Sequence, residues 1–425
     1  MVAEVAPTSR LEGTVFLPAD KSIAHRAALF AALRDEPSVI ENFPASADPQ
    51  STLGCLRQLG VCVHEDRAGH VKIAGGPLRE ASTGLDCGNS GTTMRLLAGV
   101  LAGQPFQSTL TGDDSLRSRP MDRIAAPLRQ MRANVSLTRG RVPIRITPSS
   151  GLRGITYALP IASAQVKSCV LLAGLYADGP TTVIEKEPSR DHTERMLDLT
   201  VEEVGSMRHI TIEPGHTVPS PCTVIPLDFS AAAFFLVAAS IVKDAVITMP
   251  GVGMNPTRIA LVDVLRAMGA DITIDRMRHS GSEPIGDLTV RSTELHAVSV
   301  GGSLIPGLID EIPILAVAAA CAEGTTLIRD AAELRVKETD RIHAIATNLR
   351  VLGAEVEEFP DGIAVLGNAP LQGTVVDSFG DHRIAMAMGI AGLVATGKTS
   401  IRGARAVSVS YPEFWKTLQH ISGAA

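Results

Sequence analysis

The hydrophobic pattern of the chain repeats one arrangement, in which a short polar loop opens an alanine-rich apolar helix. Each loop is followed by an apolar, alanine-rich stretch with a helical pattern and then by a strand-like stretch. The six helices predicted in this way cover residues 23–33, 92–101, 166–175, 231–242, 312–321 and 384–394.

A second pattern follows the first along the chain. A helix ends near a Leu-x-x-Leu-Gly or Leu-x-x-Met signal, and alternating apolar and polar residues come next. The glycine suits a left-handed helix cap, and the alternation predicts half-buried strands. The helix starts lie roughly 65 to 80 residues apart, which is long enough for a βαβαββ unit. Copies of the signal lie at 56–61, 128–131, 265–270 and 349–354, with a weaker one at 196–197 and a last helix at 413–421.

Six units in 425 residues divide most simply into an α/β protein of two domains with three units each. The sixth unit ends without a hairpin, whereas residues 13–17 look like a strand. We therefore expect one domain at 19–226 and a second that joins 1–18 to 227–425. The alternative is chance similarity, because a polar loop before an alanine-rich helix is ordinary in α/β proteins.

Composition narrows the class of protein. The formal charge is −6 and aromatic residues make up 3%, which argues against a nucleic-acid surface and against stacking platforms for bases. The six cysteines form no CxxC pair and no zinc-ligand spacing, so we expect buried, reduced thiols in a cytoplasmic protein and no metal. A signal pattern and an apolar run of 18 residues are both missing, which predicts no membrane span.

The stretch 85–121 shows the expected chemistry most clearly. Asn89 to Thr92 forms a small polar loop at a predicted helix start, where free N–H groups and the helix dipole favour an anion. Arg117 and Arg119 follow, and their guanidinium groups match carboxylate or phosphate oxygens. We infer an anion site here.

The other helix starts carry similar residues, and we expect them to face one anion-rich crevice. A cation such as Lys21 or Arg383 opposes the helix dipole unless an anion lies between them. The alternative is that Ser22, Thr92 and Ser230 are ordinary helix caps. The full set is Lys21, Ser22, Asn89, Ser90, Gly91, Thr92, Ser163, Gln165, Asp228, Ser230, Asp310, Glu311, Asp381, His382 and Arg383.

A second charged cluster lies at 335–341. We expect Lys337 and Arg341 on one helical face with Glu338 between them, where a carboxylate among cations is suited to proton transfer. Asp310 is a second carboxylate candidate, although it and Asp381 also suit helix caps. The alternative for 335–341 is a solvated helix start. A P-loop, a GxGxxG motif after a strand and a justified Ser-His-Asp set are missing from the sequence.

Eight stretches in this order resemble the 5-enolpyruvylshikimate-3-phosphate synthase family of enolpyruvyl transferases. The resemblance implies two domains, each an inverse α/β barrel of three βαβαββ units. It also implies transfer of the enolpyruvyl group of phosphoenolpyruvate to the 5-hydroxyl of shikimate 3-phosphate, with release of phosphate. The stretches are DKSIAHRAAL, GNSGTTMRLL, SLRSRPMDR, SAQVKS, SRDHTERML, IDEIPILAVAAA, RVKETDRI and GDHRIAMA.

The resemblance assigns the ligands residue by residue. Shikimate 3-phosphate would be bound by Lys21, Ser22, Arg26, Ser163, Ala164, Gln165, Ser189, Arg190, Asp310 and Lys337. Phosphoenolpyruvate would be bound by Lys21, Asn89, Gly91, Arg119, Gln165, Arg341, His382 and Arg383.

The resemblance also implies the proton traffic. Asp310 would accept the proton of the attacking hydroxyl. Glu338 would protonate the methylene carbon of phosphoenolpyruvate and take the proton back on elimination, with Lys21 near the same protons. No cofactor, metal, nucleic acid or membrane is implied, and we expect a monomer in the cytoplasm.

Two positions bear on inhibition by glyphosate. Val409 stands where the family often has a lysine, and Gly91 leaves room that an alanine would fill, so glyphosate sensitivity stays open.

Two alternatives to the shikimate reaction remain. The sister transferase acting on UDP-N-acetylglucosamine usually has a cysteine in the loop occupied by 116–119, and none is present. A silent anion-binding protein would be expected to lack Asp310 or Glu338.

Overall fold

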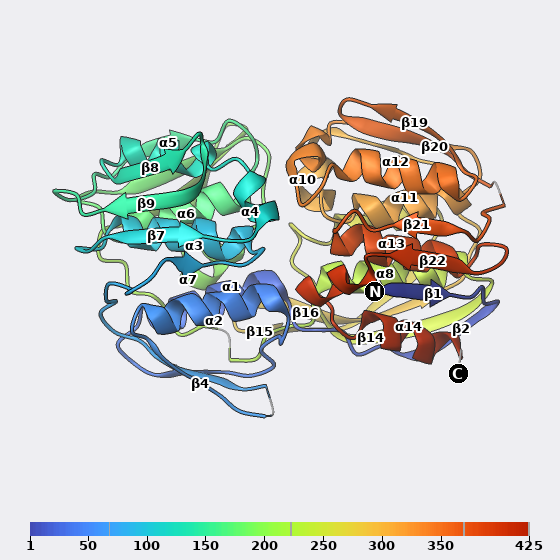
Figure 1. Ribbon diagram of the computed structural model, residues 1–425, viewed down its shortest axis with the longest axis horizontal. Coiled ribbons are helices and arrows are strands. Elements are labelled where there is room, and N and C mark those ends of the chain that lie inside the picture. The colour runs from blue at the N-terminus through green and yellow to red at the C-terminus, as the bar shows by residue number, and fades with distance from the viewer. Residues whose placement is uncertain (68, 222, 369, 424–425) are drawn as a thin grey trace. The chain divides into compact units, whose positions relative to one another are not determined.

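The computed structural model describes residues 1–67, 69–221, 223–368 and 370–423, and the chain divides into two compact units (Figure 1). Unit 1 consists of 1–18, 227–278 and 284–425, and unit 2 consists of 19–226 and 279–283. The chain therefore passes from one unit to the other four times. Both termini belong to unit 1, where β1 (Val2–Val5) begins the chain and α14 (Phe414–Ser422) ends it.

Each unit contains three small sheets, and four of the six sheets share one strand order. In each of these sheets a parallel pair of strands is followed by an antiparallel hairpin. The first strand of the repeat therefore pairs with the second, the second pairs with the fourth, and the fourth pairs with the third. This is the βαβαββ unit predicted from the repeats. Every described sheet is open, with three or four strands, and none closes on itself.

The sheets of unit 2 follow this order in chain sequence. The first has only three strands: β3 (Ser38–Ile40), β5 (Val71–Ala74) and β4 (Cys62–Glu65). The second is β6 (Leu85–Asp86), β7 (Ser108–Thr111), β9 (Arg141–Thr147) and β8 (Asn134–Thr138). The third is β10 (Thr156–Ala158), β11 (Thr181–Glu185), β13 (Met207–Ile212) and β12 (Thr200–Val204).

The N-terminal strands complete the sheets of unit 1. β2 spans Arg10–Thr14, earlier than the expected 13–17, and pairs in parallel with β14 (Asp244–Gly253). β1 pairs with β22 (Thr399–Arg402) where the sixth unit has no hairpin of its own. The other strands are β15 (Asp271–Ser280), β16 (Glu283–Arg291), β17 (Ser299–Val300), β18 (Thr325–Ile328), β19 (Glu355–Phe359), β20 (Gly362–Leu366) and β21 (Val375–Asp377).

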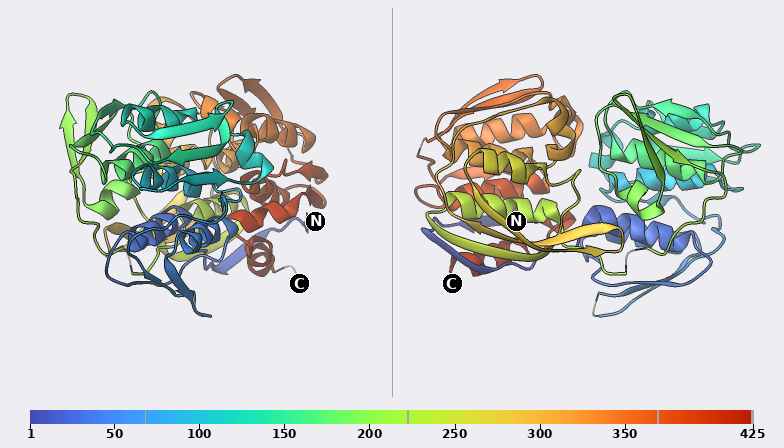
Figure 2. Two further views of the ribbon diagram at one scale, coloured as in Figure 1. Left: turned by 60° about the vertical axis from the view of Figure 1, so that its left-hand side comes forward. Right: turned by 180° about the vertical axis from the view of Figure 1, so that it is seen from behind.

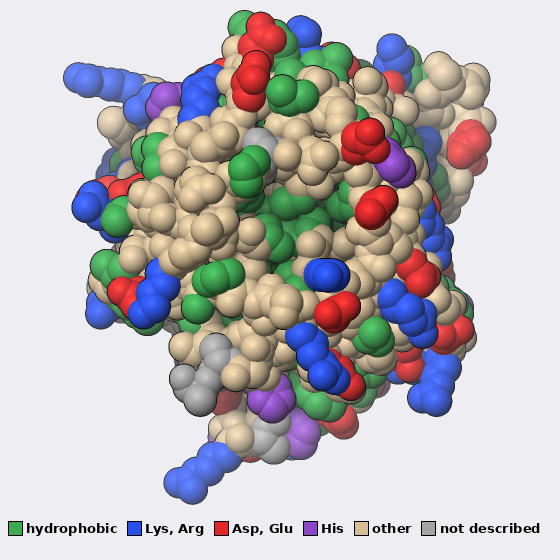
Figure 3. Space-filling model, turned by 90° about the vertical axis from the view of Figure 1, so that its right-hand side faces the viewer, with side chains coloured by type: hydrophobic (Ala, Val, Ile, Leu, Met, Phe, Trp, Pro, Cys, Tyr) green, Lys and Arg blue, Asp and Glu red, His purple; other side chains and the backbone are tan. Residues whose placement is uncertain are grey.

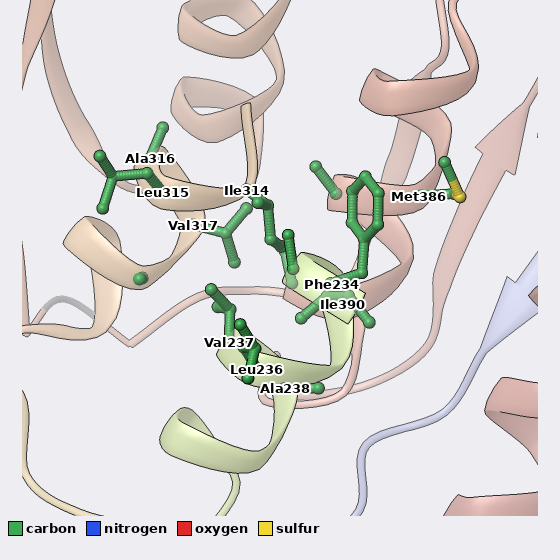
Figure 4. Close-up of a cluster of buried hydrophobic side chains, with 14 of the residues drawn as sticks. Phe234, Leu236, Val237, Ala238, Ile314, Leu315, Ala316, Val317, Met386 and Ile390 are labelled. Atoms are coloured by element: carbon green, nitrogen blue, oxygen red, sulfur yellow. The ribbon is translucent and has the colours of Figure 1, made fainter. Parts of the chain in front are cut away.

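Three inner helices form the centre of each unit. In unit 1, α8 (Phe229–Ile241), α11 (Ile312–Cys321) and α13 (His382–Gly392) pack against one another. Figure 4 shows side chains from all three helices gathered in one core, among them Phe234 and Ile390. In unit 2 the inner helices are α1 (Lys21–Ala32), α3 (Gly91–Ala102) and α6 (Ala164–Gly174). Small residues let these helices approach closely, and the helices are buried on nearly every face.

The remaining helices lie outside the inner ones and beside the sheets, whose other face is exposed, as in β9 (Figure 2). In unit 2 they are α2 (Ala47–Gln58), α4 (Asp114–Ser118), α5 (Asp122–Gln130) and α7 (His192–Leu197). In unit 1 they are α9 (Ala260–Ala267), α10 (Ile305–Leu308), α12 (Arg341–Val351) and α14. Short 3₁₀ helices are η1 (Gly302–Leu304), η2 (Ala332–Val336) and η3 (Ala404–Val409).

The burial of the cysteines agrees only in part with the expectation from the sequence. Among the described cysteines Cys55, Cys87 and Cys169 are buried as expected, but Cys62 is exposed because it begins the edge strand β4. Cys222 lies outside the described residues.

In the described part of the chain no single helix is long and apolar enough to cross a membrane, although one bent pair, 302–308 with 312–321, passes by length and composition.

Candidate functional site

The inner helices of unit 2 are buried along almost their whole length, and only their first turns reach the surface. α1 leaves Lys21 and Ser22 partly exposed, α3 leaves Thr92, and α6 leaves Ala164 and Gln165. Free backbone N–H groups and the positive dipole end make these turns suited to anions. Of the residues predicted from the loop-to-helix pattern, Lys21, Ser22, Thr92 and Gln165 are thus helix residues that a ligand can reach, whereas Gly91 is buried.

The helix caps separate two interpretations of these first turns. Asp20, Ser90 and Ser163 accept the capping hydrogen bonds of α1, α3 and α6. The capping interpretation is therefore wrong for Ser22 and Thr92, which lie one or more residues inside the helices. It is also wrong for Ser230, because Asp228 caps α8.

Asn89 and Arg119 are joined directly, as the sequence stretch 85–121 suggests. Arg119 Nη2 donates to Asn89 Oδ1 at 2.8 Å, and Asn89 Nδ2 donates to Asp113 Oδ2 at 2.8 Å. Arg119 follows the short helix α4 and is 7% exposed. A Cβ atom on Gly91 would lie 2.6 Å from Arg95 Nη1 and 3.3 Å from Arg119 Nη1, so the glycine leaves room for both guanidinium groups.

Arg95 is a member of this cluster that the sequence analysis missed. Its Nη1 donates to Gln165 Oε1 at 2.5 Å, and Gln165 Nε2 donates to Thr92 Oγ1 at 2.9 Å. These bonds tie the first turns of α3 and α6 together. Its position one helical turn after Gly91 could have pointed to Arg95, but the residue lies within a stretch that was predicted as an apolar helix.

Lys21 is held by a carboxylate that the sequence analysis also missed. Its Nζ lies 3.0 Å from Asp48 Oδ2, at the first turn of α2. The Lys21 side chain remains 18% exposed, so the ammonium group is fixed and still reachable. Asp48 stands in the loop-like sequence Ala47-Asp48-Pro49, which gave no hint of a charged partner.

Arg26 lies deeper than a surface ligand. Nε donates to Thr193 Oγ1 at 2.7 Å, Nη2 to Ser168 Oγ at 2.9 Å, and Nη1 to the carbonyl oxygen of Ser22 at 2.9 Å. Burial lowers the pKa of Arg26 to about 10, against the opposing effect of Glu194. Arg26 is therefore still a cation at neutral pH and supports the first turn of α1.

In unit 1, Arg341 is surrounded by three carboxylates. Nη2 donates to Glu338 Oε2 at 2.6 Å, Nη1 to Asp310 Oδ1 at 3.1 Å, and Nε to Asp381 Oδ2 at 2.7 Å. Burial alone would lower the pKa of Arg341, yet Asp381, Glu338 and Asp310 raise it above its ordinary value. The cluster brings both predicted proton-transfer carboxylates to one buried guanidinium group.

The start of α12 corrects one expectation. Lys337 and Glu338 do not lie on a helical face with Arg341, because Asp340 caps α12 and the helix begins at Arg341. Glu338 reaches Arg341 from the preceding loop instead. A solvated helix start is also wrong for Arg341, which is 1% exposed. Burial lowers the pKa of the half-buried Lys337, while the carboxylate of Asp310 acts in the other direction.

Arg383 joins the same cluster from the first turn of α13. Its Nη1 donates to the carbonyl oxygen of Asp310 at 2.9 Å, and its Nη2 lies 3.6 Å from Asp310 Oδ2. Asp381 is a helix cap, since it accepts the N–H of Arg383 at 2.8 Å, and it also binds Arg341. His382 is 2% exposed beside them.

A buried layer under Arg383 was only partly expected. Ser230 Oγ donates to Glu311 Oε1 at 2.5 Å, Arg258 Nη2 lies 2.7 Å from Ser230 Oγ, and Arg383 Nη1 lies 3.5 Å from Glu311 Oε1. The sequence gave Ser230 and Glu311 as helix-start residues, but not Arg258, which stands in a loop before α9.

Acidic and basic side chains are interspersed on the face of the molecule in Figure 3, without a large patch of one sign. Across 1–67, 69–221, 223–368 and 370–423, no group of three or more His, Cys, Asp or Glu side chains is placed to hold a metal ion. Val409 is half-buried in η3.

The chain matches known proteins over nearly its whole length. The family model of EPSP synthase (3-phosphoshikimate 1-carboxyvinyltransferase) matches residues 5–418. A 3-phosphoshikimate 1-carboxyvinyltransferase of Salinibacter ruber is 59% identical over 99% of this chain and 100% of the relative. One of Herpetosiphon aurantiacus is 51% identical, with 100% of both covered. An EPSP synthase structure from Acinetobacter baumannii has a TM-score of 0.86 and 40% identity, over 99% of this chain and 98% of that one.

These similarities favour the shikimate reaction over the sister transferase and over a silent anion-binding protein. They also confirm the two-domain α/β class. The chain is a transferase of aromatic amino acid biosynthesis that uses shikimate 3-phosphate and phosphoenolpyruvate, and it belongs to the EPSP synthase family.

Proposed function

We propose that Asp310, Glu338 and Arg341 of unit 1 carry the chemical step of enolpyruvyl transfer in this chain. The observation that supports this is the contact of one buried guanidinium group with both carboxylates, at 3.1 and 2.6 Å. A substrate anion that binds Arg341 must come close to the two groups that exchange protons. Positioning contributes most to catalysis when the reacting groups and charges are in place before the substrate binds.

The ligand sets remain proposals and are divided between the units. The accessible first turns of α1, α3 and α6 support a role in anion binding for the predicted residues of unit 2. For shikimate 3-phosphate the proposed ligands are Lys21, Ser22, Arg26, Ser163, Ala164, Gln165, Arg190, Asp310 and Lys337, with Ser189 in the loop that carries Arg190. For phosphoenolpyruvate they are Lys21, Asn89, Gly91, Arg119, Gln165, Arg341, His382 and Arg383.

The proposed step conserves atoms and protons. The 5-hydroxyl oxygen bonds to C2 of phosphoenolpyruvate while Asp310 takes the hydroxyl proton and Glu338 gives a proton to C3. In the tetrahedral intermediate C3 is a methyl group. Elimination then breaks the bond between C2 and the phosphate oxygen, and Glu338 takes the proton back from C3. The proton held by Asp310 passes to the departing phosphate or to water, which restores the Asp310 carboxylate. Cations offset the charge that accumulates on the departing phosphate.

Phosphate release tests the reaction and Glu338 together. The chain should release phosphate from shikimate 3-phosphate with phosphoenolpyruvate, and Glu338→Ala should keep ligand binding while it loses turnover by roughly two orders of magnitude or more. Glu357→Ala, an exposed glutamate of β19, is the matched control and should behave as the unmodified protein. Unchanged turnover in Glu338→Ala would remove this residue from the mechanism. Release only with UDP-N-acetylglucosamine would move the assignment to the sister reaction.

Oligomeric state and location are predictions of a different kind. We propose a monomer that acts in the cytoplasm, in keeping with the role in small-molecule biosynthesis. Light scattering after size-exclusion chromatography checks the first, since a mass near 89 kDa in place of about 45 kDa would show a dimer of this 44.6 kDa chain. Cell fractionation checks the second.

A further inference from the structure

A buried charge cluster lies under the loop 186–191 of unit 2. Lys167 of α6 is fully buried, with Nζ 3.0 and 2.9 Å from the two carboxylate oxygens of Glu185 and 2.6 Å from Glu194 Oε1. Glu185 ends β11 and is 1% exposed, and Glu194 lies in α7 at 3%. Buried charges are costly unless they are paired, so these ion pairs hold α6, β11 and α7 in fixed positions relative to one another.

Ser189 of this loop has its hydrogen-bonding groups engaged by the cluster. Its hydroxyl donates to Glu185 Oε2 at 2.8 Å, and its backbone N–H donates to the same oxygen at 3.2 Å. Its carbonyl oxygen accepts from Lys167 Nζ at 3.3 Å. Arg208 of β13 also contacts Glu185, at 2.9 Å from Oε1. Glu185 is therefore a charged acceptor held between two cations.

A serine hydroxyl carries one proton, and that of Ser189 is committed to Glu185. Phosphate oxygens only accept hydrogen bonds, so the Ser189 hydroxyl has nothing to offer a phosphate group while this bond persists. The next residue, Arg190, supplies a half-buried cation, whereas the other cation of the loop, Lys186, is exposed. The direct ligand role predicted for Ser189 therefore conflicts with the contacts that Ser189 makes.

We propose that Glu185, clamped by Lys167, is a positioning residue for shikimate 3-phosphate that fixes the 186–191 loop through Ser189. Ser189 then serves the site by anchoring the loop, and Arg190 contacts the ligand anion. This proposal rests on the enolpyruvyl transfer stated above and refines which residues recognise its shikimate substrate.

The neighbouring hydrogen bonds extend the same support to α1. Ser168 follows Lys167 in α6, and Ser168 Oγ lies 2.6 Å from Thr193 Oγ1, the residue before Glu194. Both hydroxyl groups accept from Arg26 of α1. A shift of the 186–191 loop would therefore disturb Arg26 through Thr193 and Ser168. Because Arg26 is proposed to bind shikimate 3-phosphate, the loss of affinity should be specific to that substrate.

Steady-state kinetics of three variants test the proposal, once turnover of the unmodified chain with both substrates is established. Glu185→Gln should raise the KM for shikimate 3-phosphate roughly tenfold and leave the KM for phosphoenolpyruvate within about twofold. Ser189→Ala should change both KM values by less than about twofold, because no donor to the ligand is lost. The control Glu187→Gln makes the same chemical change at a half-buried glutamate of the same loop and should leave both values unchanged.

Two results would overturn the proposal. A KM for shikimate 3-phosphate raised as much by Ser189→Ala as by Glu185→Gln would make the Ser189 hydroxyl a ligand donor. Equal KM values for Glu185→Gln and Glu187→Gln would make Glu185 a structural residue only. If a thermal melt shows that Glu185→Gln does not fold, Arg208→Gln removes one cation from Glu185 at a side chain that is 20% exposed. It should raise the same KM several-fold, by about threefold or more, and an unchanged KM would again contradict the proposal.

Discussion

A buried hydrogen-bond chain in unit 2 fixes the protonation state of one histidine. Thr93 Oγ1 donates to Ser90 Oγ at 2.7 Å, so the proton between Thr52 and Thr93, at 2.7 Å, must come from Thr52. The Nδ1 atom of His25, 2.7 Å from Thr52 Oγ1, then has to donate. Among the described residues Nε2 of His25 has no partner, so a second proton there would be buried and unsatisfied.

The stability of the protein should therefore depend on pH through His25. Burial, and then the charges of Lys21 and Arg26, lower the pKa of His25 well below 6.5. As pH falls below that value the unfolded chain binds a proton that the folded chain does not, so the free energy of unfolding falls. One proton contributes a slope of about 1.4 kcal/mol per pH unit. Denaturation midpoints between pH 7 and about pH 5 should fall less steeply in His25→Gln than in the unmodified chain.

The control for this effect is an exposed histidine. His64→Gln, in the edge strand β4, should leave the pH slope of the midpoints unchanged. If His25→Gln and the unmodified chain show the same slope, the proton on His25 has no influence on folding in this range.

The residues proposed to bind a ligand were easier to find in the sequence than the residues that support them. Lys21 and Arg341 stand in polar stretches at helix starts, where their charge is conspicuous. Lys167 and Glu185 stand in apolar segments, and only the fold shows that each charge meets an opposite one. Which buried charges pair depends on contacts far apart in sequence, and no local pattern records them.

At the scale of elements, the contact between α3 and α6 shows how close the inner helices lie. A Cβ atom on Gly99 of α3 would come 2.2 Å from the carbonyl oxygen of Cys169 in α6. Real Cβ atoms do not approach a backbone oxygen so closely, and the helix backbone has no side-chain freedom with which to give way. Gly99 is thus required by packing, although glycine lowers helix propensity.

Alanine substitutions at two helical glycines should have opposite effects. Gly99→Ala should lower the free energy of unfolding by about 1–3 kcal/mol or more, because it forces α3 and α6 apart. Gly54→Ala, in α2, meets nothing within 4 Å and should raise it by about 0.5–1 kcal/mol through helix propensity. Chemical denaturation of both variants measures the difference. Equal stability of the two would mean that the helices can move apart without cost.

Helix starts were also the least certain elements in the sequence. The pattern placed Lys337 and Arg341 on one helix, but Asp340 accepts the N–H of His343 at 3.0 Å and begins α12. Asp340 also accepts from Arg335 Nη1 at 2.7 Å, which holds the preceding loop against the helix. An aspartate within a charged run gives no sign of which of its neighbours it caps, so the boundary needed the tertiary contacts.

For the whole molecule, repetition was the most informative property of the sequence. Six copies of one pattern predicted six βαβαββ units, and four of the six sheets have the corresponding strand order. The sequence also predicted that an N-terminal strand joins the second domain, but it gave one strand at 13–17, whereas the structure has β1 and β2, which pair with strands hundreds of residues away. Such pairing leaves no trace in local periodicity.

The charge balance of unit 1 has a consequence for ligand binding. Arg341 contacts Asp310, Glu338 and Asp381, and Arg383 lies 3.6 Å from Asp310. The guanidinium groups are thus compensated by carboxylates before a ligand arrives. A ligand with a phosphate and a carboxylate would add negative charge to this cluster, which favours protonation of a carboxylate that loses its guanidinium partner.

Glu338 should accordingly take up a proton when the phosphoenolpyruvate site is filled. The probe is 2-phospholactate, a saturated analogue that cannot react, added with shikimate 3-phosphate. Calorimetry in two buffers of different ionisation enthalpy should show that the unmodified chain takes up more protons than Glu338→Gln, by up to about one per site near neutral pH. Protonation of the ligand phosphate is common to both and cancels, and Glu357→Gln should match the unmodified chain. Equal uptake in Glu338→Gln would mean that Glu338 keeps its contact with Arg341, or stays ionised, in the filled site, and it would then need another source for the proton it is proposed to give to C3.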